Sequence, residues 1–269
     1  MALTVLEVLK SLPRTNCGEC GQPTCLAFAT QVIKEGEDLG KCPHLAAGDE
    51  FGELIRAQQQ AGVGRRRESV AISLEVLQAK AAPLNFAALA AGLGAEYGEE
   101  AGRPYLIMPY FGNCLQVFKD ELRYPPGALA DPWDAILLYN YIASGGNREP
   151  AGEWIAYNSL PNSVSKAKTL ARLERELAAR FSGRASGLKG RAANLGAEMV
   201  AVGGEDADIQ AVFQPLPRVP ILLLFWDADP TEGFEAQGRL LFDATVSDYL
   251  DLEAILFLVE HLLARLMGG

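Results

Sequence analysis

The chain has 269 residues, 49% hydrophobic and 22% charged, so it carries enough apolar material for a folded core. Its formal net charge of -10 at pH 7 is spread along the chain, and nucleic acid is not an expected partner because phosphate binding requires a positive surface. No apolar run approaches the ~18 to 20 residues of a membrane-spanning helix, and residues 1–12 lack the apolar region of a secretory signal. We therefore expect a cytoplasmic protein without a membrane partner.

The front of the chain predicts three short helices around a cysteine-bearing loop. Their ranges are Thr4–Leu12, Thr24–Lys34 and Asp49–Gln60. Cys25 then lies in the first turn of the second helix, where N–H groups without helical partners and the helix dipole favour negative charge. A Gln- and Gly-rich stretch leading to Arg65–Arg67 predicts a solvated linker. We expect a cysteine module over residues 1–62 and a larger domain over residues 68–269.

The larger domain mixes helices and strands without βαβ alternation. Helices are predicted over Ser69–Ala79, Asn85–Leu93, Pro132–Ala143, Ser165–Phe181, Gly187–Met199 and Asp251–Met267. Strands are predicted over Tyr105–Met108, Cys114–Phe118, Trp154–Tyr157, Ile209–Phe213, Val219–Trp226 and Arg239–Phe242. The nearly continuous apolar run at Val219–Trp226 indicates the central strand of its sheet. The whole pattern predicts an α+β fold, in which a small helical module precedes a domain with a mainly antiparallel sheet.

The first two predicted strands should form a hairpin around Gly112–Asn113. Pro109 cannot donate to a strand ladder, so we expect the first of them to lie at a sheet edge, and the turn residues do not suggest a clean two-residue turn. Cys114 lies in this apolar setting and is predicted to be a small buried hydrophobic residue, with a role as a fifth ligand or redox group as the alternative.

Four of the five cysteines lie within the first 42 residues. Cys17, Cys20 and Cys25 fall within nine residues, and Cys42 stands alone before Pro43. Structural zinc sites usually take two separated Cys-x2-4-Cys pairs, whereas a compact triplet with a remote Cys-Pro is typical of an iron-sulfur cubane. In a reducing compartment, clustered thiols bind metal more often than they form disulfides.

Two glycines lie between these cysteines. Gly18 and Gly21 would let the backbone adopt unusual dihedral angles close to inorganic sulfide, although either can be an ordinary turn glycine. Together with the spacing, they favour one [4Fe-4S] cluster, with zinc and disulfide bonds as the alternatives.

The stretch Thr15–Ala29, followed by Lys41–Pro43, resembles the N-terminal iron-sulfur domain of the corrinoid/iron-sulfur protein large subunit family. A similar motif occurs in the B subunit of Rnf-type electron-transport complexes. The resemblance covers residues 3–54 and implies one [4Fe-4S] cluster. The ligands that it implies are Cys17, Cys20, Cys25 and Cys42.

The remaining chain resembles a domain found fused to this same cluster module, for which the resemblance implies no activity. The residues that carry this likeness are Trp154, Pro217–Pro220, Trp226, Leu241–Asp243 and Asp248–Leu250.

Few other residues suggest chemistry. His44 follows Cys42 and could donate a hydrogen bond to a cluster sulfur, while His261 is expected to be structural. With two histidines, neither near a nucleophile motif, no catalytic set is recognised and an enzymatic role is left open. The acidic stretch Asp227–Glu235 matches no EF-hand loop and is predicted to be a surface turn, with a divalent-cation site as the alternative.

These observations predict a low-potential electron carrier that acts with a redox partner. By analogy with the family, that partner could be a corrinoid-dependent methyl-transfer protein. In the alternative, the cluster is structural and the chain is an interaction or assembly module. A third hypothesis is an enzyme whose substrate binds beside the cluster.

Overall fold

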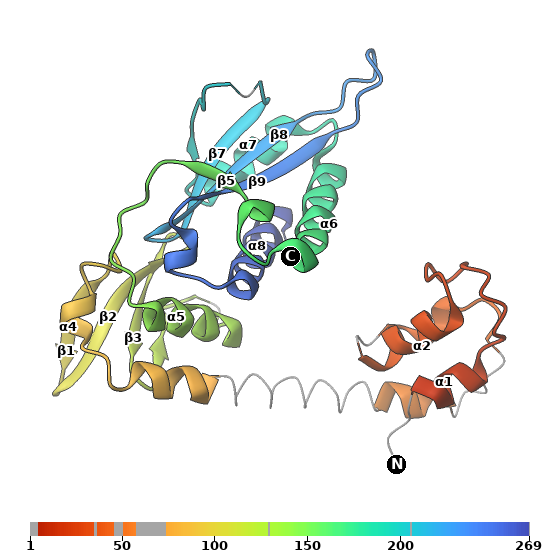
Figure 1. The fold of residues 1–269 in the computed structure, drawn as a ribbon, viewed down its shortest axis with the longest axis horizontal. Coiled ribbons are helices and arrows are strands. Elements are labelled where there is room, and N and C mark those ends of the chain that lie inside the picture. The colour runs from red at the N-terminus through yellow and green to blue at the C-terminus, as the bar shows by residue number, and fades with distance from the viewer. Residues whose placement is uncertain are drawn as a thin grey trace. The chain divides into compact units, whose positions relative to one another are not determined.

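The computed structural model describes residues 5–34, 37–45, 51–57, 74–128, 130–204 and 206–268. The chain divides into two compact units, Met1–Ile72 and Ser73–Gly269, and each is described by itself (Figure 1). The predicted linker at Arg65–Arg67 lies outside the described residues. Helices and antiparallel sheets together confirm the predicted α+β fold.

Among its described residues, the first unit forms only helices and the loops between them, the longest of which covers residues 12–24. Its elements are α1 (Val5–Ser11), α2 (Cys25–Lys34), the 3-10 helix η1 (Leu39–Lys41) and a helix over residues 51–57. Helices this short are marginal alone, so tertiary packing must stabilise them. Val8, Phe28, Val32 and Ile55 bring the three α-helical segments into one small apolar core.

The second unit begins with a helix over residues 74–81, the short α4 (Phe86–Leu89) and a four-stranded antiparallel sheet, sheet A. Its strands, in spatial order, are β1 (Glu96–Glu100), β2 (Arg103–Tyr110), β3 (Asn113–Phe118) and β4 (Leu122–Arg123). β1 was not predicted, because its sequence is mostly acidic and shows no apolar alternation. In the structure most of its residues are exposed. The helix predicted over residues 85–93 is shorter, since the chain turns over residues 90–94.

The hairpin between β2 and β3 differs from the prediction in two ways. Phe111 and Gly112 form a two-residue turn, and both have positive φ, +46° and +77°, as type I′ turns require. β2 is an inner strand, so the expected edge position is wrong. Pro109 is tolerated there because pairing with β1 ends at Ile107, so its missing N–H removes no bond to that strand.

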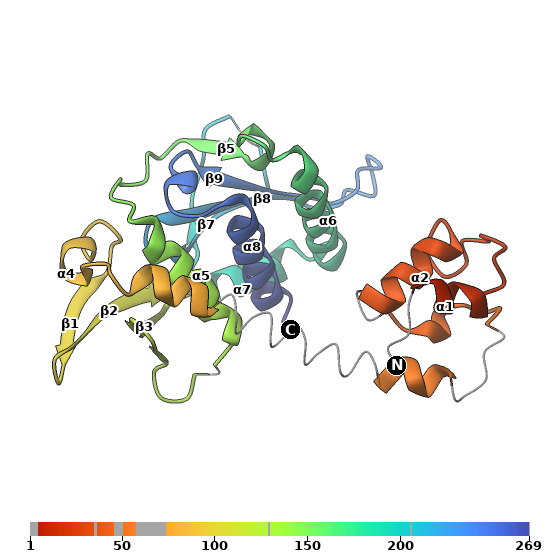
Figure 2. The same cartoon turned by 60° about the horizontal axis from the view of Figure 1, so that its bottom comes forward.

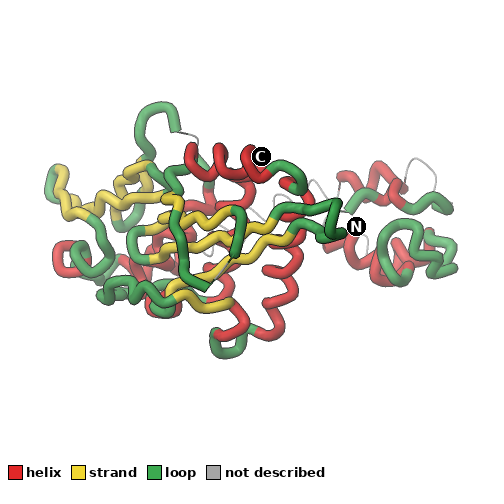
Figure 3. Tube along the Cα trace, turned by 90° about the horizontal axis from the view of Figure 1, so that it is seen from above, coloured by secondary structure: helices red, strands yellow, loops and turns green. Residues whose placement is uncertain are grey.

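A second, five-stranded antiparallel sheet, sheet B, has the order β5-β9-β8-β7-β6. Figure 3 shows strands in yellow lying side by side, with helices in red next to them. The strands are β5 (Trp154–Ala156), β6 (Glu198–Met199), β7 (Ile209–Leu216), β8 (Val219–Trp226) and β9 (Gln237–Asp243). The central place of β8 confirms the prediction. Its residues alternate between two apolar clusters, with Leu223 in the main core and Leu222 and Leu224 on the opposite face.

Four longer helices complete the second unit. They are α5 (Pro132–Ser144), α6 (Val164–Phe181), α7 (Ala185–Asn194) and α8 (Leu252–Met267). α6, α7 and α8 pack on the face of sheet B that carries the main core (Figure 2). α7 ends earlier than predicted, because Gly196 turns the chain with a φ of +76° into β6. Among the described residues, no helix combines the length and apolar character needed to cross a membrane.

Candidate metal centre

The loop that carries the first cysteines depends on left-handed backbone positions. Asn16, Gly18 and Gly21 have φ values of +51°, +77° and +81°. Glycine reaches this region without steric cost, and asparagine does so more readily than most residues. The Gly21 N–H donates to the Gly18 carbonyl at 2.9 Å, which closes a tight turn around Cys20.

Helix α2 begins at Cys25, one residue later than predicted, so Cys25 lies in its first turn as expected. The Thr24 hydroxyl accepts the Ala27 N–H at 3.0 Å and caps the helix. The Asn16 side chain reaches over nine residues, and its Oδ1 accepts the Cys25 N–H at 2.8 Å. This bond ties the start of the cysteine loop to the helix, so Cys17 and Cys25 belong to one closed loop.

Cys42 is positioned by the 3-10 helix before it. The Asp38 carboxylate accepts the Gly40 N–H at 2.9 Å and caps this helix. The Cys42 N–H then donates to the Leu39 carbonyl at 3.3 Å. Leu39 is buried in the core of the first unit, which fixes the approach of this segment to α2.

Three of the four predicted ligands belong to the apolar core of the first unit or pack against it. Cys25 and Cys42 are 8% and 7% exposed and belong to the apolar core of the first unit, and Cys20 packs against it. Cys17 is exposed. That the four sulfurs bind one metal centre stays a prediction, developed below.

The donor set and its surroundings fit an iron-sulfur cluster. Four thiols are the usual ligands of a [4Fe-4S] cluster. A side chain built at Gly21 would meet no atom within 4 Å, and one at Gly18 would meet only the Gln22 carbonyl at 3.9 Å. The loop thus leaves open space beside both glycines.

His44 lies beside Glu19 at the exposed side of the loop. Its Nε2 is 3.0 Å from Glu19 Oε2, and the ligand atoms of these two residues and Cys17 all lie within 4.8 Å of one another. The hydrogen bond predicted from His44 to a cluster sulfur stays a prediction, and Glu19 is its partner in this structure.

The prediction that Cys114 is buried is wrong. Cys114 is exposed in β3, where alternation turns Leu115 and Val117 inward and Cys114 outward. Its pairing partner in β2, Pro109, is exposed as well.

The acidic stretch after β8 serves the backbone, in agreement with a surface turn. Asp227 accepts the N–H groups of Gly183 and Ala185, at 2.5 and 3.0 Å, at the start of α7. Burial acts to raise the pKa of Asp227, but these hydrogen bonds outweigh it and the pKa is lowered. Asp229 accepts the Thr231 N–H at 2.8 Å within the turn.

A second group of titratable side chains was not predicted as a cluster. Asp131, Asp134 and His261 have ligand atoms within 4.8 Å of one another. Arg265 lies among them, 3.3 Å from His261 Nδ1 and 3.7 Å from Asp134 Oδ1. Its guanidinium supplies the positive charge that a metal ion would bring. Burial lowers the pKa of His261, and the Tyr110 hydroxyl donates to Asp134 at 2.8 Å. This network fits the structural role predicted for His261.

The comparisons place the first unit in a class. Residues 12–44 match the family model described as "Putative Fe-S cluster". The chain is 52% identical over 46 residues to the corrinoid/iron-sulfur protein large subunit of Moorella thermoacetica, covering 17% of this chain and 10% of that protein. It is 43% identical over 75 residues to the acetyl-CoA decarbonylase/synthase complex subunit gamma 2 of Methanosarcina mazei, covering 24% of this chain and 16% of that protein. These matches confirm the resemblance at the front of the chain, and the chain spans only a small part of these relatives.

The larger part of the chain matches a second family model. Residues 85–265 match the family model described as "Domain of unknown function (DUF3786)", which covers more than half of the chain. The chain belongs to this family. No solved structure matches this chain.

Proposed function

We propose that Cys17, Cys20, Cys25 and Cys42 bind one [4Fe-4S] cluster, and that the first unit exchanges single electrons with a partner protein. The arrangement of the cysteines carries this proposal. Cys25 and Cys42 lie in the apolar core, whereas Cys17 is exposed. A cluster on these ligands would have one side in the core and one side open to a partner, as electron exchange requires.

The surroundings of the cysteines favour a low potential. When bound, such a cluster takes up and releases one electron at a potential set by net charge, hydrogen bonds to sulfur and exposure. Acidic side chains outnumber basic ones over residues 1–62. This negative charge opposes the uptake of an electron, so the reduced form should be a good donor.

The partner that we propose is a corrinoid-dependent methyl-transfer protein. The front unit is related to subunits named for a corrinoid/iron-sulfur protein and for an acetyl-CoA decarbonylase/synthase complex. The acidic surface of this chain would complement a basic surface on the partner, which speeds encounter. Reduced thiols and an oxygen-sensitive cofactor suit a cytoplasmic location.

The metal assignment is tested by purifying the full chain anaerobically and measuring iron, sulfide and zinc. We expect about four iron atoms per chain and a signal in electron paramagnetic resonance after reduction with dithionite. Cys42→Ala should lose or degrade the cluster. Cys114→Ala is the matched control, because Cys114 lies in the second unit and is exposed, and it should retain all the iron. Stoichiometric zinc without iron would contradict the proposal.

The electron-carrier role needs a separate measurement. The dithionite-reduced protein, freed of reductant, is mixed with oxidised corrinoid/iron-sulfur protein, and reduction of the corrinoid is followed by its visible absorbance. Electron transfer from the wild type and none from Cys42→Ala is the expected result. A cluster that is present but cannot be reduced would favour the alternative, a structural cluster in an assembly module.

A further inference from the structure

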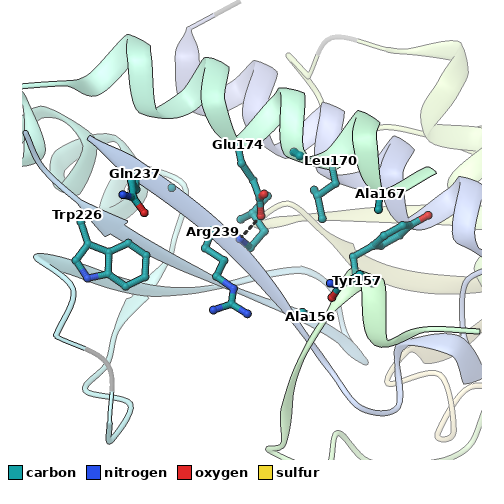
Figure 4. A pocket seen from close by; sticks show the side chains of 12 residues that line it. Ala156, Tyr157, Ala167, Leu170, Glu174, Trp226, Gln237 and Arg239 are labelled. Atoms are coloured by element: carbon teal, nitrogen blue, oxygen red, sulfur yellow. Dashed lines mark hydrogen bonds between the residues drawn. The ribbon is translucent and has the colours of Figure 1, made fainter. Parts of the chain in front are cut away.

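A cavity of about 420 Å³ opens in the second unit between α6 and the edge of sheet B (Figure 4). It exists because β5 is short and pairs only with Leu241–Asp243 of β9. Within the described residues, the preceding part of β9, from Gln237 to Leu240, therefore has no strand on that side, and α6 lies there instead. The volume is within the range of small-molecule sites.

Glu174 extends from α6 into this cavity. It follows the apolar face of the helix, since the buried residues Leu170 and Leu177 lie one turn before it and one turn after it. Its Oε1 accepts the Leu240 N–H at 2.8 Å, as the dashed line in Figure 4 marks. Burial raises the pKa of Glu174. Within the described residues, no hydrogen bond to its second oxygen is found.

Arg239 provides the opposite charge at the same cavity. It is exposed on β9, and its positive charge acts on the Glu174 carboxylate. Among the described residues, no ion pair and no hydrogen bond to the Arg239 guanidinium is found. In Figure 4, Glu174 comes from α6 and Arg239 from β9, with the guanidinium directed away from the Glu174 carboxylate and Trp226 at one end of the cavity. The two charges line one cavity without neutralising each other by direct contact.

A purely structural role explains only part of this arrangement. Glu174 caps the open edge of β9 by satisfying the Leu240 N–H, and a buried backbone donor needs such a partner. A glutamine would provide the same acceptor without the cost of burying a charge. The negative charge and the unpaired cation beside it therefore point to a ligand that uses both.

We propose that this cavity binds a small zwitterion of the amino-acid class, with its ammonium group on Glu174 and its carboxylate on Arg239. The planar guanidinium matches a carboxylate in geometry. Leu170 and Trp226 offer apolar and aromatic surface for the rest of the molecule. A peptide strand added to β9 is disfavoured, because Glu174 already occupies the Leu240 N–H that such a strand would need.

The test is calorimetric titration of the anaerobically purified full chain with each of the common L-amino acids at millimolar concentration. At least one should bind. Glu174→Gln keeps the acceptor for Leu240 and removes the charge, and Arg239→Gln changes an exposed side chain, so both variants should fold. Each should weaken binding by at least about tenfold, because a charge-assisted hydrogen bond is lost. Glu176→Gln, on the exposed side of the same helix, is the matched control and should bind like the wild type.

Derivatives of the ligand test the assignment of each charge. The N-acetyl derivative lacks the ammonium group, so it should bind weakly to the wild type and lose nothing further in Glu174→Gln. The amide derivative lacks the carboxylate and should behave in the same way with Arg239→Gln. Absence of binding by every amino acid, or binding that both variants leave unchanged, overturns the proposal.

Discussion

Several loops of the second unit are stabilised by one carboxylate that accepts hydrogen bonds from more than one backbone N–H group. Asp243, at the end of β9, is buried and accepts hydrogen bonds from Ala151, Gly152 and Thr245. Burial alone would raise the pKa of Asp243, but these donors outweigh it and the pKa is lowered. The folded chain thus binds the proton less tightly than the unfolded chain. The resulting stability is present above the ordinary pKa of aspartate and is lost as the pH falls through the lowered value.

We predict that Asp243→Asn lowers the free energy of unfolding by about 2 to 4 kcal/mol, because an amide cannot accept from donors on both of its heavy atoms. Urea denaturation of the full chain at neutral pH measures this change. Asp229→Asn is the control, since asparagine makes the same exposed turn, and it should cost less than about 1 kcal/mol. Equal effects in the two variants would contradict this account.

Glu174 should have the opposite pH dependence. Because burial raises its pKa, the folded chain binds this proton more tightly than the unfolded chain. Its contribution to stability is therefore full below the ordinary pKa of glutamate and is lost as the pH rises through the raised value. Glu174→Gln should then melt at a higher temperature than the wild type at neutral pH, and the difference should shrink on acidification. Thermal unfolding over a pH series checks this, and a lower melting temperature at neutral pH would refute it.

At the scale of elements, the cysteine loop depends on Asn16. Its side chain caps the Cys25 N–H, and its backbone is left-handed. Asn16→Ala removes the cap and strains the backbone, so we expect a loss of about 1 to 3 kcal/mol and faster loss of iron to a chelator. Asn16→Gly removes the cap without the strain and should be less severe. Iron release followed by absorbance distinguishes the two, and a wild-type rate in Asn16→Ala would contradict the role of this residue.

Elements with strong local signals could be predicted from the sequence. α8 begins after Asp251, whose carboxylate caps the helix. β8 could be predicted because its sequence is a run of apolar residues that covers both faces of the strand. β1 could not be predicted, because Glu99 and Glu100 are poor strand formers and pairing with β2 fixes its conformation. The two residues of β6 are likewise strand only because they pair with β7.

The candidate sites also differ in how much of them a local sequence pattern can predict. For the metal centre, the spacing of the cysteines predicts that the four belong together, since the chemistry of a cluster would impose such a spacing. Glu174 leaves a local trace, as an acidic residue that interrupts the apolar side of its helix. Its relation to Arg239 depends on the packing of α6 against β9, which lie far apart in sequence, and no local pattern reports it.

At the scale of the molecule, the two units differ greatly in core size. The core of the first unit is small and includes two of the predicted ligands, whereas the main core of the second unit draws on both sheets and all the longer helices. Small domains often need a metal for stability. We predict that iron removal abolishes one calorimetric transition and leaves a second, from the second unit, unchanged. Loss of both transitions together would contradict independent folding.

The pairing of β5 with β9 has a consequence during synthesis. Trp154 lies opposite Asp243, so sheet B cannot be completed until the chain has left the ribosome as far as Asp243. The elements of the first unit, in contrast, contact close neighbours in sequence, and local contacts form fastest. We expect the four cysteines to be ready for cofactor loading on the nascent chain, while the domain that they precede is still incomplete.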